Sequence, residues 1–495
     1  MGSIQKQSIR STVIIILGFA VGAFNMLFLV PRILSPEMLG LTRVITDAGL
    51  TLATLCTLGS LPVIYKFFPF YKSYLKPEKN DLPFVTAMVC IIGFIIMCLA
   101  GWLGRDIIER KFSERSPLFV EFSYLVYPYC FFILFFMWLE AFGWSFRKSI
   151  ATNTLRELLP RLLFTVLLLL LTAKMISDNR FLQIFSLSYM VSGFVLFLIL
   201  RKTKQFLFVP KISSVTDRLQ YKMASFGFFI FGSQFLNLLS RTIDTFILTA
   251  KGDRGLTDTA VLTIATYIVT LLEVPQRSMN SVTIPVLAES WKNKDLAGIK
   301  SIYKKSVANL LVVGLGMFGL IWLNLHNLSG LLGKDFAGIE SVILFMGAAK
   351  LIDLGTGANG QIMGTSSYWK VDFIVNVAYT ILALPMNYYL ISYYGLMGAA
   401  YSMLISLTFY NILRFSFLFL KFNMQPYTLK NLLAIVIAVA ATIAVSFIPT
   451  QSNIFLDTFI RSVVFLILFI PTTYISGISQ EINSTIERYL PLKKK

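Results

Sequence analysis

Residues 84–103 read FVTAMVCIIGFIIMCLAGWL, a run of twenty residues without a single charged side chain. A helix needs about 20 mostly apolar residues to cross the roughly 30 Å hydrocarbon core of a bilayer. This stretch therefore predicts a transmembrane helix. Comparable runs recur from one end of the chain to the other with only short polar breaks. The sequence as a whole predicts a set of membrane-spanning helices.

The composition agrees with this prediction. The chain has 495 residues, of which 56% are hydrophobic and 14% are charged, and its mean hydropathy is +0.72. Soluble globular domains are much less apolar, and the polar breaks are too short for a large soluble domain. The net charge of +19 is spread over short loops rather than gathered in one basic module, so we expect no nucleic-acid partner.

The predicted fold class is an all-α integral membrane protein with about fourteen transmembrane helices. The expected spans are residues 11–32, 39–64, 84–103, 117–142, 158–177, 181–200, 224–250, 257–284, 306–326, 339–361, 371–392, 397–419, 431–449 and 458–477. With both termini in the cytoplasm, about 28 of the 44 basic residues fall in cytoplasmic loops and about 12 outside. This bias supports an even number of spans.

The longest polar break divides the spans into two groups. We expect an N-terminal lobe of six helices at 1–200, a cytoplasmic linker at 201–223, a C-terminal lobe of six helices at 224–419, and an appended helix pair with a basic tail at 420–495. The second span ends in Leu61-Pro62-Val63 and the eighth in Ile284-Pro285-Val286. This short echo favours two lobes related by a parallel repeat, as in transporters that bind their substrate between halves.

Several charged side chains lie inside predicted spans, where each costs about 2.5 to 3.5 kcal/mol and needs a partner, water or a function. Residues at helical spacing form a polar stripe on the seventh span and a polar face on the eighth, and two further spans carry a pair of opposite charges. These residues are Gln234, Asn237, Arg241 and Asp244; Glu273, Arg277 and Asn280, beside Pro275; Lys350 and Asp353; and Arg43 and Asp47.

Two interpretations of these charges stay open. In one, neighbours on the same helix neutralise each other, because a spacing of three or four residues allows an ion pair; Lys350 with Asp353 is one such pair. In the other, Arg241, Arg277 and Lys350 line a wet cavity that attracts an anion such as a diphosphate headgroup. The polar groups of the same cavity are Gln234, Asn237 and Asn280. The groups that could bind a coupling ion are Asp244, Glu273 and Asp353.

We expect structural rather than functional roles for four other features of the sequence. We expect Arg414 to extend toward the membrane interface, because it lies near the end of its span. The single histidine, His326, and the four cysteines do not have metal-ligand spacing, so neither a metal site nor another cofactor is expected. The glycines of Gly355-Thr356-Gly357-Ala358-Asn359-Gly360 follow a membrane span rather than a strand. They indicate a loosened helix end rather than a dinucleotide site.

Five stretches together resemble the polysaccharide transporter, or Wzx-type oligosaccharide flippase, branch of the multidrug/oligosaccharidyl-lipid/polysaccharide (MOP) exporter superfamily. The resemblance covers nearly the whole chain. It is carried by Leu17-Gly18-Phe19, by the run from Phe28 through Val30-Pro31-Arg32 to Gly40, by Asn237 with Ile243-Asp244-Thr245-Phe246-Ile247-Leu248, by Ile284-Pro285-Val286, and by Tyr393-Tyr394-Gly395-Leu396-Met397-Gly398-Ala399-Ala400.

The resemblance implies two lobes, alternating access and an undecaprenyl-diphosphate-linked oligosaccharide as cargo, such as a repeat unit of O-antigen, capsule or exopolysaccharide. It also implies the bacterial cytoplasmic (inner) membrane, with membrane lipids and other polysaccharide assembly proteins as partners. A proton or sodium ion is the expected coupling ion if transport is coupled. On this view the chain is a transporter and not an enzyme.

The alternatives are a cation-coupled multidrug (MATE-like) exporter, a lipid II flippase, and a membrane glycan polymerase or ligase. Exporters of the first kind usually carry a buried carboxylate on the first span, whereas Ser11 to Pro31 contains no acid. A polymerase or ligase needs a sizeable outer loop to hold the acceptor, and every outer loop expected here is about 15 residues or shorter.

Overall fold

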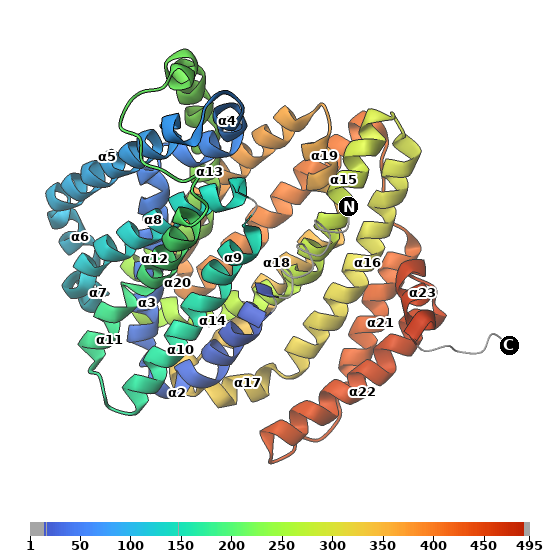
Figure 1. Cartoon of the computed structure of the whole chain (residues 1–495). Coiled ribbons are helices and arrows are strands. Elements are labelled where there is room, and N and C mark those ends of the chain that lie inside the picture. Colours follow the sequence, from blue (N-terminus) through green and yellow to red (C-terminus); the bar gives the residue numbers. More distant parts are fainter. Residues whose placement is uncertain (1–13, 16, 147, 490–495) are drawn as a thin grey trace. The chain divides into compact units, whose positions relative to one another are not determined.

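A computed structural model describes residues 14–15, 17–146 and 148–489, and the side chains of a few residues within its helices are not described. Every regular element in those ranges is a helix, so the predicted all-α fold class is confirmed. The chain divides into two compact units, Met1–Ala260 and Val261–Lys495 (Figure 1). The boundaries of the lobes, linker and helix pair expected from the sequence remain predictions.

The first unit contains an apolar helical stretch, Leu17–Ile33, whose middle part, Asn25–Leu29, is a π-helical turn. Its labelled helices are α2 (Val30–Ile33), α3 (Pro36–Cys56), α4 (Ser60–Tyr74), α5 (Leu82–Leu103), α6 (Arg105–Phe112), α7 (Pro117–Phe122), α8 (Val126–Ser145), α9 (Ser149–Asn153), α10 (Leu159–Thr172), α11 (Asp178–Phe185), α12 (Ser188–Arg201) and α13 (Ser214–Lys251).

Helix α3 is the central element of this unit and packs against α5, α8 and α13. Its start follows from the family-like run around Pro36. The Ser35 hydroxyl accepts a hydrogen bond from the backbone N–H of Met38 at 3.2 Å, and Pro36 occupies the first turn, where no amide hydrogen is needed. Gly40 lies so close to α14 that a Cβ there would be 1.9 Å from the Leu256 carbonyl oxygen. The motif thus joins two helices closely.

The linker expected at 201–223 is tied to the rest of this unit by Asp81. Its carboxylate accepts hydrogen bonds from the backbone N–H of Ser213 at 2.9 Å and from the hydroxyl of Thr216 at 2.7 Å. Thr216 also hydrogen-bonds the Tyr71 hydroxyl at 2.6 Å. Burial raises the pKa of Tyr71 to about 12, so this phenol stays protonated at neutral pH. The contact fixes the start of α13.

The second unit contains longer and more often interrupted helices. They are α14 (Leu256–Thr270), which begins in the first unit, α15 (Val274–Lys292), α16 (Leu296–Leu323), α17 (Leu325–Leu332), α18 (Ile339–Gly355), α19 (Asn359–Thr365), α20 (Trp369–Phe422), α21 (Leu429–Ser446), α22 (Ile454–Ile475) and α23 (Gln480–Tyr489). Short turns of other helical types occur in both units. In the first unit they are η1 (Asn25–Leu29), η2 (Pro77–Lys79), η3 (Ser123–Leu125) and η4 (Thr154–Leu158), and in the second unit they are η5 (Leu271–Glu273) and η6 (Lys334–Phe336).

Two expected spans of this unit are broken where the sequence predicts a break. The tight turn η5 separates α14 from α15, and Pro275 lies in the first turn of α15, where its missing N–H costs no hydrogen bond. Helices α18 and α19 meet at a bend of 50°. Gly357 lies in that bend with a φ of +62°, a conformation that glycine adopts without strain.

Helix α20 consists of two helices that are joined across a kink. Gly395 has a non-helical conformation, with φ 53° and ψ −129°, so two helical arms meet there. Gly398 follows at a point where a Cβ would lie 2.1 Å from the Leu390 carbonyl oxygen. The family-like run from Tyr393 to Ala400 is therefore a tight corner that needs two glycines.

The expected count of about fourteen spans is not confirmed. Among the described residues, nine helices are long and apolar enough to cross a membrane, or ten if α18 and α19 together form one span. Helix α20 enters this count once although it has two arms, and the stretch Leu17–Ile33 and α10 are too short to enter it. Helix α13, with 38 residues, is not among the nine. Fourteen remains a prediction.

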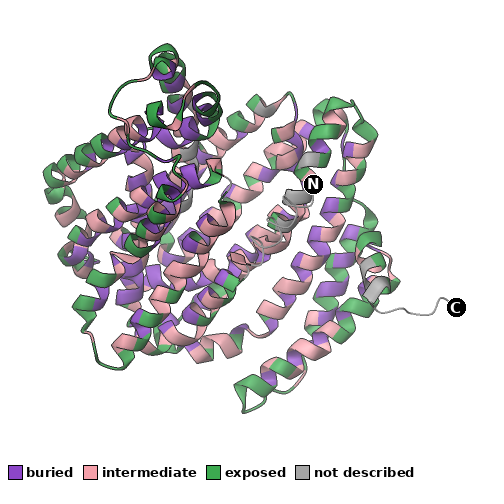
Figure 2. Cartoon of the chain, viewed as in Figure 1, coloured by how far each residue is buried: buried purple, intermediate pink, exposed green. Residues whose placement is uncertain are grey.

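The exposed surfaces of several helices are apolar, as expected where they face lipid. On α22, Phe455, Phe459 and Ile467 are exposed, and only 22% of its most apolar window is buried (Figure 2). An apolar helix that leaves most of its surface uncovered would aggregate in water but is stable in a bilayer. The chain is therefore a multi-pass membrane protein.

The C-terminal helices α21 and α22 are packed together and against α16 (Figure 1). Phe465 and Phe469 stack with their ring centroids 5.3 Å apart, and a Cβ at Gly319 would lie 2.4 Å from the Phe465 ring. Glycine on α16 therefore lets an aromatic side chain of α22 lie directly on its backbone. Helices α21 and α22 therefore share one hydrophobic core with α16 within the second unit.

Candidate functional site

The break between α14 and α15 places a carboxylate between two basic side chains. Glu273 is the last residue of η5, and Arg277 follows one turn later on α15. The Arg277 guanidinium lies 2.9 Å from the Glu273 carboxylate. The ammonium of Lys350, from the middle of α18, forms a second ion pair with the same carboxylate. Residues from three elements thus meet at one point.

This cluster carries one more positive charge than negative charge. Of the same-helix pairs that the spacing allows, Glu273 with Arg277 is present, whereas Lys350 is paired with Glu273 rather than with Asp353. Lys350 reaches Glu273 instead, because their elements lie in contact. The side chains of Lys350 and Glu273 are 15% and 20% exposed, and that of Arg277 is 54% exposed. The guanidinium is the accessible member.

Asn280 lies one turn beyond Arg277 on α15, on the face that the sequence predicts to be polar. Its side-chain oxygen is buried and accepts no hydrogen bond from any residue that the structure describes. Leaving a buried acceptor unsatisfied costs about 1–3 kcal/mol. Such an atom is typical of a site that water or a ligand completes.

Asp353 belongs to a separate amide network. Its carboxylate accepts a hydrogen bond from the side-chain amide of Asn411, on α20, at 3.0 Å. The Asn411 oxygen in turn accepts hydrogen bonds from Thr356 at 2.7 Å and from Asn359 at 3.0 Å. Sequence analysis missed Asn411, Thr356 and Asn359. Thr356 and Asn359 are uncharged polar residues at the broken end of an apolar span, and Asn411 is one within the apolar second arm of α20.

Arg414, which we expect to extend toward the membrane interface, forms an ion pair within the second unit. Its guanidinium lies 2.8 Å from the Asp372 carboxylate and 4.0 Å above the ring of Tyr410. The Arg414 side chain is only 14% exposed. Tyr410 donates a hydrogen bond to Asn376 at 2.9 Å. Both arms of α20 supply these residues, so the pair holds the arms together.

The first unit has its own buried polar cluster. Arg43 pairs with Asp47 at 2.6 Å, as the spacing predicts, and Thr245 donates a hydrogen bond to Asp47 at 2.8 Å. Asp244 accepts a hydrogen bond from the backbone N–H of Thr245 at 2.8 Å. Three further predicted site residues lie on α13 with side chains outside the described residues, so their roles remain predictions. They are Gln234, Asn237 and Arg241.

Within residues 14–15, 17–146 and 148–489, no three or more His, Cys, Asp or Glu side chains are grouped so that they could hold a metal ion. Several charged groups in the described spans form ion pairs or belong to an amide network.

Broken helices with ionisable groups at the break, inside a helical membrane protein, are the architecture of a secondary transporter. Comparison with known families agrees with this class. The sequence profile described as "Polysaccharide biosynthesis protein" matches residues 7–291, which is more than half of the chain. The chain belongs to the polysaccharide biosynthesis protein family. Comparison with curated protein sequences finds no relative.

Solved structures show the same fold at low sequence identity. Lipid II flippase MurJ, in an inward closed conformation, matches with a TM-score of 0.69 and 13% identity, covering 98% of this chain and 100% of that chain. An inward-facing MATE multidrug transporter of the MOP superfamily matches with a TM-score of 0.61 and 15% identity, covering 82% and 93%. A MOP superfamily transporter from Pyrococcus furiosus matches at 0.57 and 15%, covering 83% and 94%. The expected MOP-type fold is confirmed.

Proposed function

We propose that this protein flips an undecaprenyl-diphosphate-linked oligosaccharide from the cytoplasmic to the outer leaflet of the bacterial inner membrane. The observation that carries the proposal is the cluster of Arg277, Glu273 and Lys350, in which two basic side chains share one carboxylate. The excess positive charge suits an anion. Membership of the polysaccharide biosynthesis family supports a glycan-linked cargo.

The proposed chemistry assigns a role to each side chain. Arg277 offers a planar fork of donors that matches phosphate oxygens, and Lys350 supplies a compact positive charge. Glu273 holds both cations inside the bilayer when no cargo is bound, because it offsets much of their desolvation cost. The unsatisfied oxygen of Asn280 would accept a hydrogen bond from water or from a hydroxyl group of the cargo.

The proposal extends to topology and energetics. Both termini lie in the cytoplasm, the two lobes expose the site to one leaflet at a time, and the isoprenoid chain stays in lipid. No resident cofactor is needed. If transport is coupled to an ion, a proton or sodium ion would bind at Asp244, Glu273 or Asp353, the acidic groups that lie inside the spans. Other polysaccharide assembly proteins would supply and accept the cargo.

The MATE-like alternative has one observation in its favour, the fold shared with a MATE transporter. The chain nevertheless continues into α21 and α22, and the match to the lipid II flippase covers 98% of the chain, against 82% for the MATE transporter. The described part of the first span, residues 14–15 and 17–33, also contains no acidic residue. These differences favour a flippase.

The test is to deplete the protein in its bacterium and analyse lipid-linked glycans. We expect one diphosphate-linked oligosaccharide to accumulate in a form that a membrane-impermeant glycosidase cannot reach in spheroplasts. Wild-type protein should restore access, and Arg277→Ala at equal membrane abundance should not. Arg110→Gln, at an exposed position, is the matched control and should restore access. If no glycan accumulates while sensitivity to toxic compounds rises, the exporter alternative replaces the proposal.

A further inference from the structure

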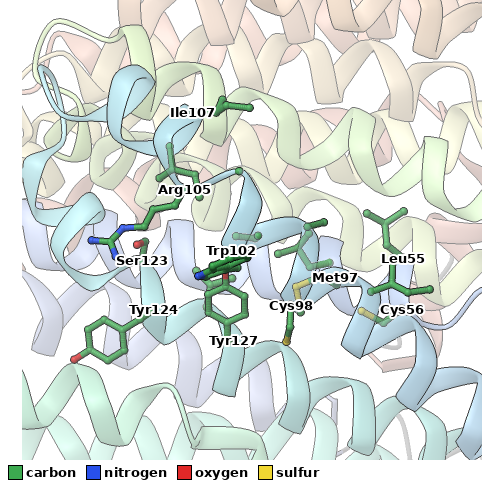
Figure 3. A pocket seen from close by; sticks show the side chains of 18 of the residues that line it. Leu55, Cys56, Met97, Cys98, Trp102, Arg105, Ile107, Ser123, Tyr124 and Tyr127 are labelled. Carbon is green, nitrogen blue, oxygen red and sulfur yellow. The ribbon is translucent and has the colours of Figure 1, made fainter.

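A cavity of about 920 Å³ lies within the first unit, between α3, α5, α6, α7 and α8 (Figure 3). Its wall is apolar over most of its length and includes Leu52, Leu55, Ile96 and Met97. The candidate site described above is built from other residues. A cavity of this size and polarity is within the range that holds a small apolar ligand or part of a lipid.

The depth of the cavity matches one leaflet of a bilayer. Along α5 it extends from Gly93 to Gly104, about 16 Å at a rise of 1.5 Å per residue. Half of a hydrocarbon core of roughly 30 Å is nearly the same length. At Gly93, α5 touches α3 so closely that a Cβ there would lie 2.2 Å from the Cys56 carbonyl oxygen.

The mouth of the cavity has the side chains of a membrane interface. Trp102, Tyr124 and Tyr127 line it, and aromatic rings with a polar tip favour the headgroup level. Beyond them the apolar helix α5 gives way to the polar helix α6. Arg105 pairs with Glu109 there at 2.9 Å.

The charges at the mouth select among lipids. Arg105, Glu109 and Glu121 all line the cavity, so one guanidinium stands with two carboxylates. A diphosphate headgroup would be repelled by this net negative charge, and a phosphatidylglycerol headgroup has no cation for the carboxylates. A zwitterionic aminophospholipid offers both a phosphate for Arg105 and an ammonium for Glu109 or Glu121.

We propose that this cavity holds one acyl chain of a phosphatidylethanolamine taken from the surrounding leaflet. The chain lies along α5 with its end near Gly93, and the headgroup binds the charged residues at the mouth. The site binds a structural lipid and not the cargo, because the long isoprenoid chain of the cargo exceeds a slot that is one leaflet deep. The bound lipid would keep α5 and α8 apart at this end of the unit.

The test uses the full-length protein in phosphatidylcholine liposomes with a trace of photoreactive lipid. Phosphatidylethanolamine and phosphatidylglycerol carry the same diazirine near the end of one acyl chain, and labelled peptides are mapped after illumination. We expect labels in residues 52–58 and 93–104, with phosphatidylethanolamine about two- to fivefold above phosphatidylglycerol, the gain of one exposed ion pair.

Two sets of variants make the test specific. Ala100→Phe fills the cavity and should abolish this labelling, whereas Leu99→Phe, at an exposed position that does not line the cavity, should keep it. Glu109→Gln combined with Glu121→Gln should keep the labelling but remove the preference, and it tests the charges even if Ala100→Phe does not fold. Absence of label from these peptides in the wild type, or equal labelling by both lipids, would overturn the proposal. Stronger labelling by phosphatidylglycerol would also overturn it.

Discussion

Glu273 is the single acid that holds two basic side chains at the break before α15. Glu273→Gln leaves Arg277 and Lys350 close together without a counter-charge, and we expect a loss of about 3 kcal/mol or more in stability, as for other broken buried pairs. Lys350→Met leaves the pair of Glu273 with Arg277 intact. It should preserve stability and abolish flipping. Membrane abundance and complementation of a depleted strain measure the two effects.

The conservative variant separates these roles further. Lys350→Arg keeps the charge and should restore a large part of the activity that Lys350→Met loses. If Lys350→Met lowers abundance as strongly as Glu273→Gln, the lysine is a structural partner of the acid, and the proposed anion site loses its support.

Arg414 and Asp372 form a mostly buried pair, with side chains 14% and 20% exposed. Asp372→Asn should lower the stability of the purified protein by about 3–5 kcal/mol, because the guanidinium is left without its counter-charge. The exposed pair of Lys305 and Glu481, at 55% and 51%, is the matched control. Lys305→Gln should cost about 1 kcal/mol or less. Thermal unfolding in one detergent compares the two, and equal shifts would contradict the assignment.

Ion pairs within one helix could be predicted from the sequence, whereas ion pairs between helices could not. Spacing on one helix predicted the pairs of Arg43 with Asp47 and of Glu273 with Arg277, because residues three or four apart are always neighbours. It did not identify the partners of Lys350 and Arg414, which lie on another element and on the other arm of a bent helix, respectively. Such contacts depend on how helices pack, and the charge pattern of one span does not contain that information.

Helix packing depends on glycine at a few close approaches. A Cβ at Gly40 would lie 1.9 Å from the Leu256 carbonyl oxygen, so Gly40→Ala must move α3 away from α14. We expect it to cost about 1–3 kcal/mol, the usual price of overpacking. In α17, a Cβ at Gly330 meets no atom within 4 Å, and Gly330→Ala should gain about 0.5–1 kcal/mol. Opposite shifts of the unfolding temperature are the expected result.

The connection between α12 and α13 is held through Asp81. Asp81→Ala removes the acceptor for the Ser213 amide and the Thr216 hydroxyl, so residues 202–213 should become more accessible. We expect faster cleavage of this segment by protease in inside-out vesicles. Lys79→Ala, at an exposed position in the same turn, should leave the rate unchanged. Unchanged cleavage in Asp81→Ala would show that other contacts hold the segment.

At the scale of elements, the apolar runs located most helices well. Pro275 and the glycines around Gly357 also marked two breaks correctly, because proline and glycine act on the backbone itself. The helix pair expected at 420–495 packs in one core with α16, and its place outside the repeat of two lobes remains a prediction. Hydropathy cannot distinguish a helix that packs on protein from one that faces lipid, because both surfaces are apolar.

For the whole molecule, the length of α20 bears on how the helices map onto membrane crossings. The segment Lys370–Phe422 has 53 residues, about 80 Å of helix at 1.5 Å per residue. A single crossing needs only roughly 30 Å. Since the backbone turns at Gly395, the simplest arrangement is two crossings joined by a corner at the membrane surface. This brings the helix count closer to the fourteen spans predicted from the sequence.

This arrangement predicts the sidedness of α20. In a chain whose four cysteines are replaced by alanine, Tyr393→Cys and Lys421→Cys place one thiol at the corner and one at the end of the second arm. Both positions are exposed. With cytoplasmic termini and fourteen spans, a membrane-impermeant maleimide should label Tyr393→Cys in intact cells and Lys421→Cys only after permeabilisation. Labelling of both from one side would mean that α20 does not cross twice, and the even number of spans would then be wrong.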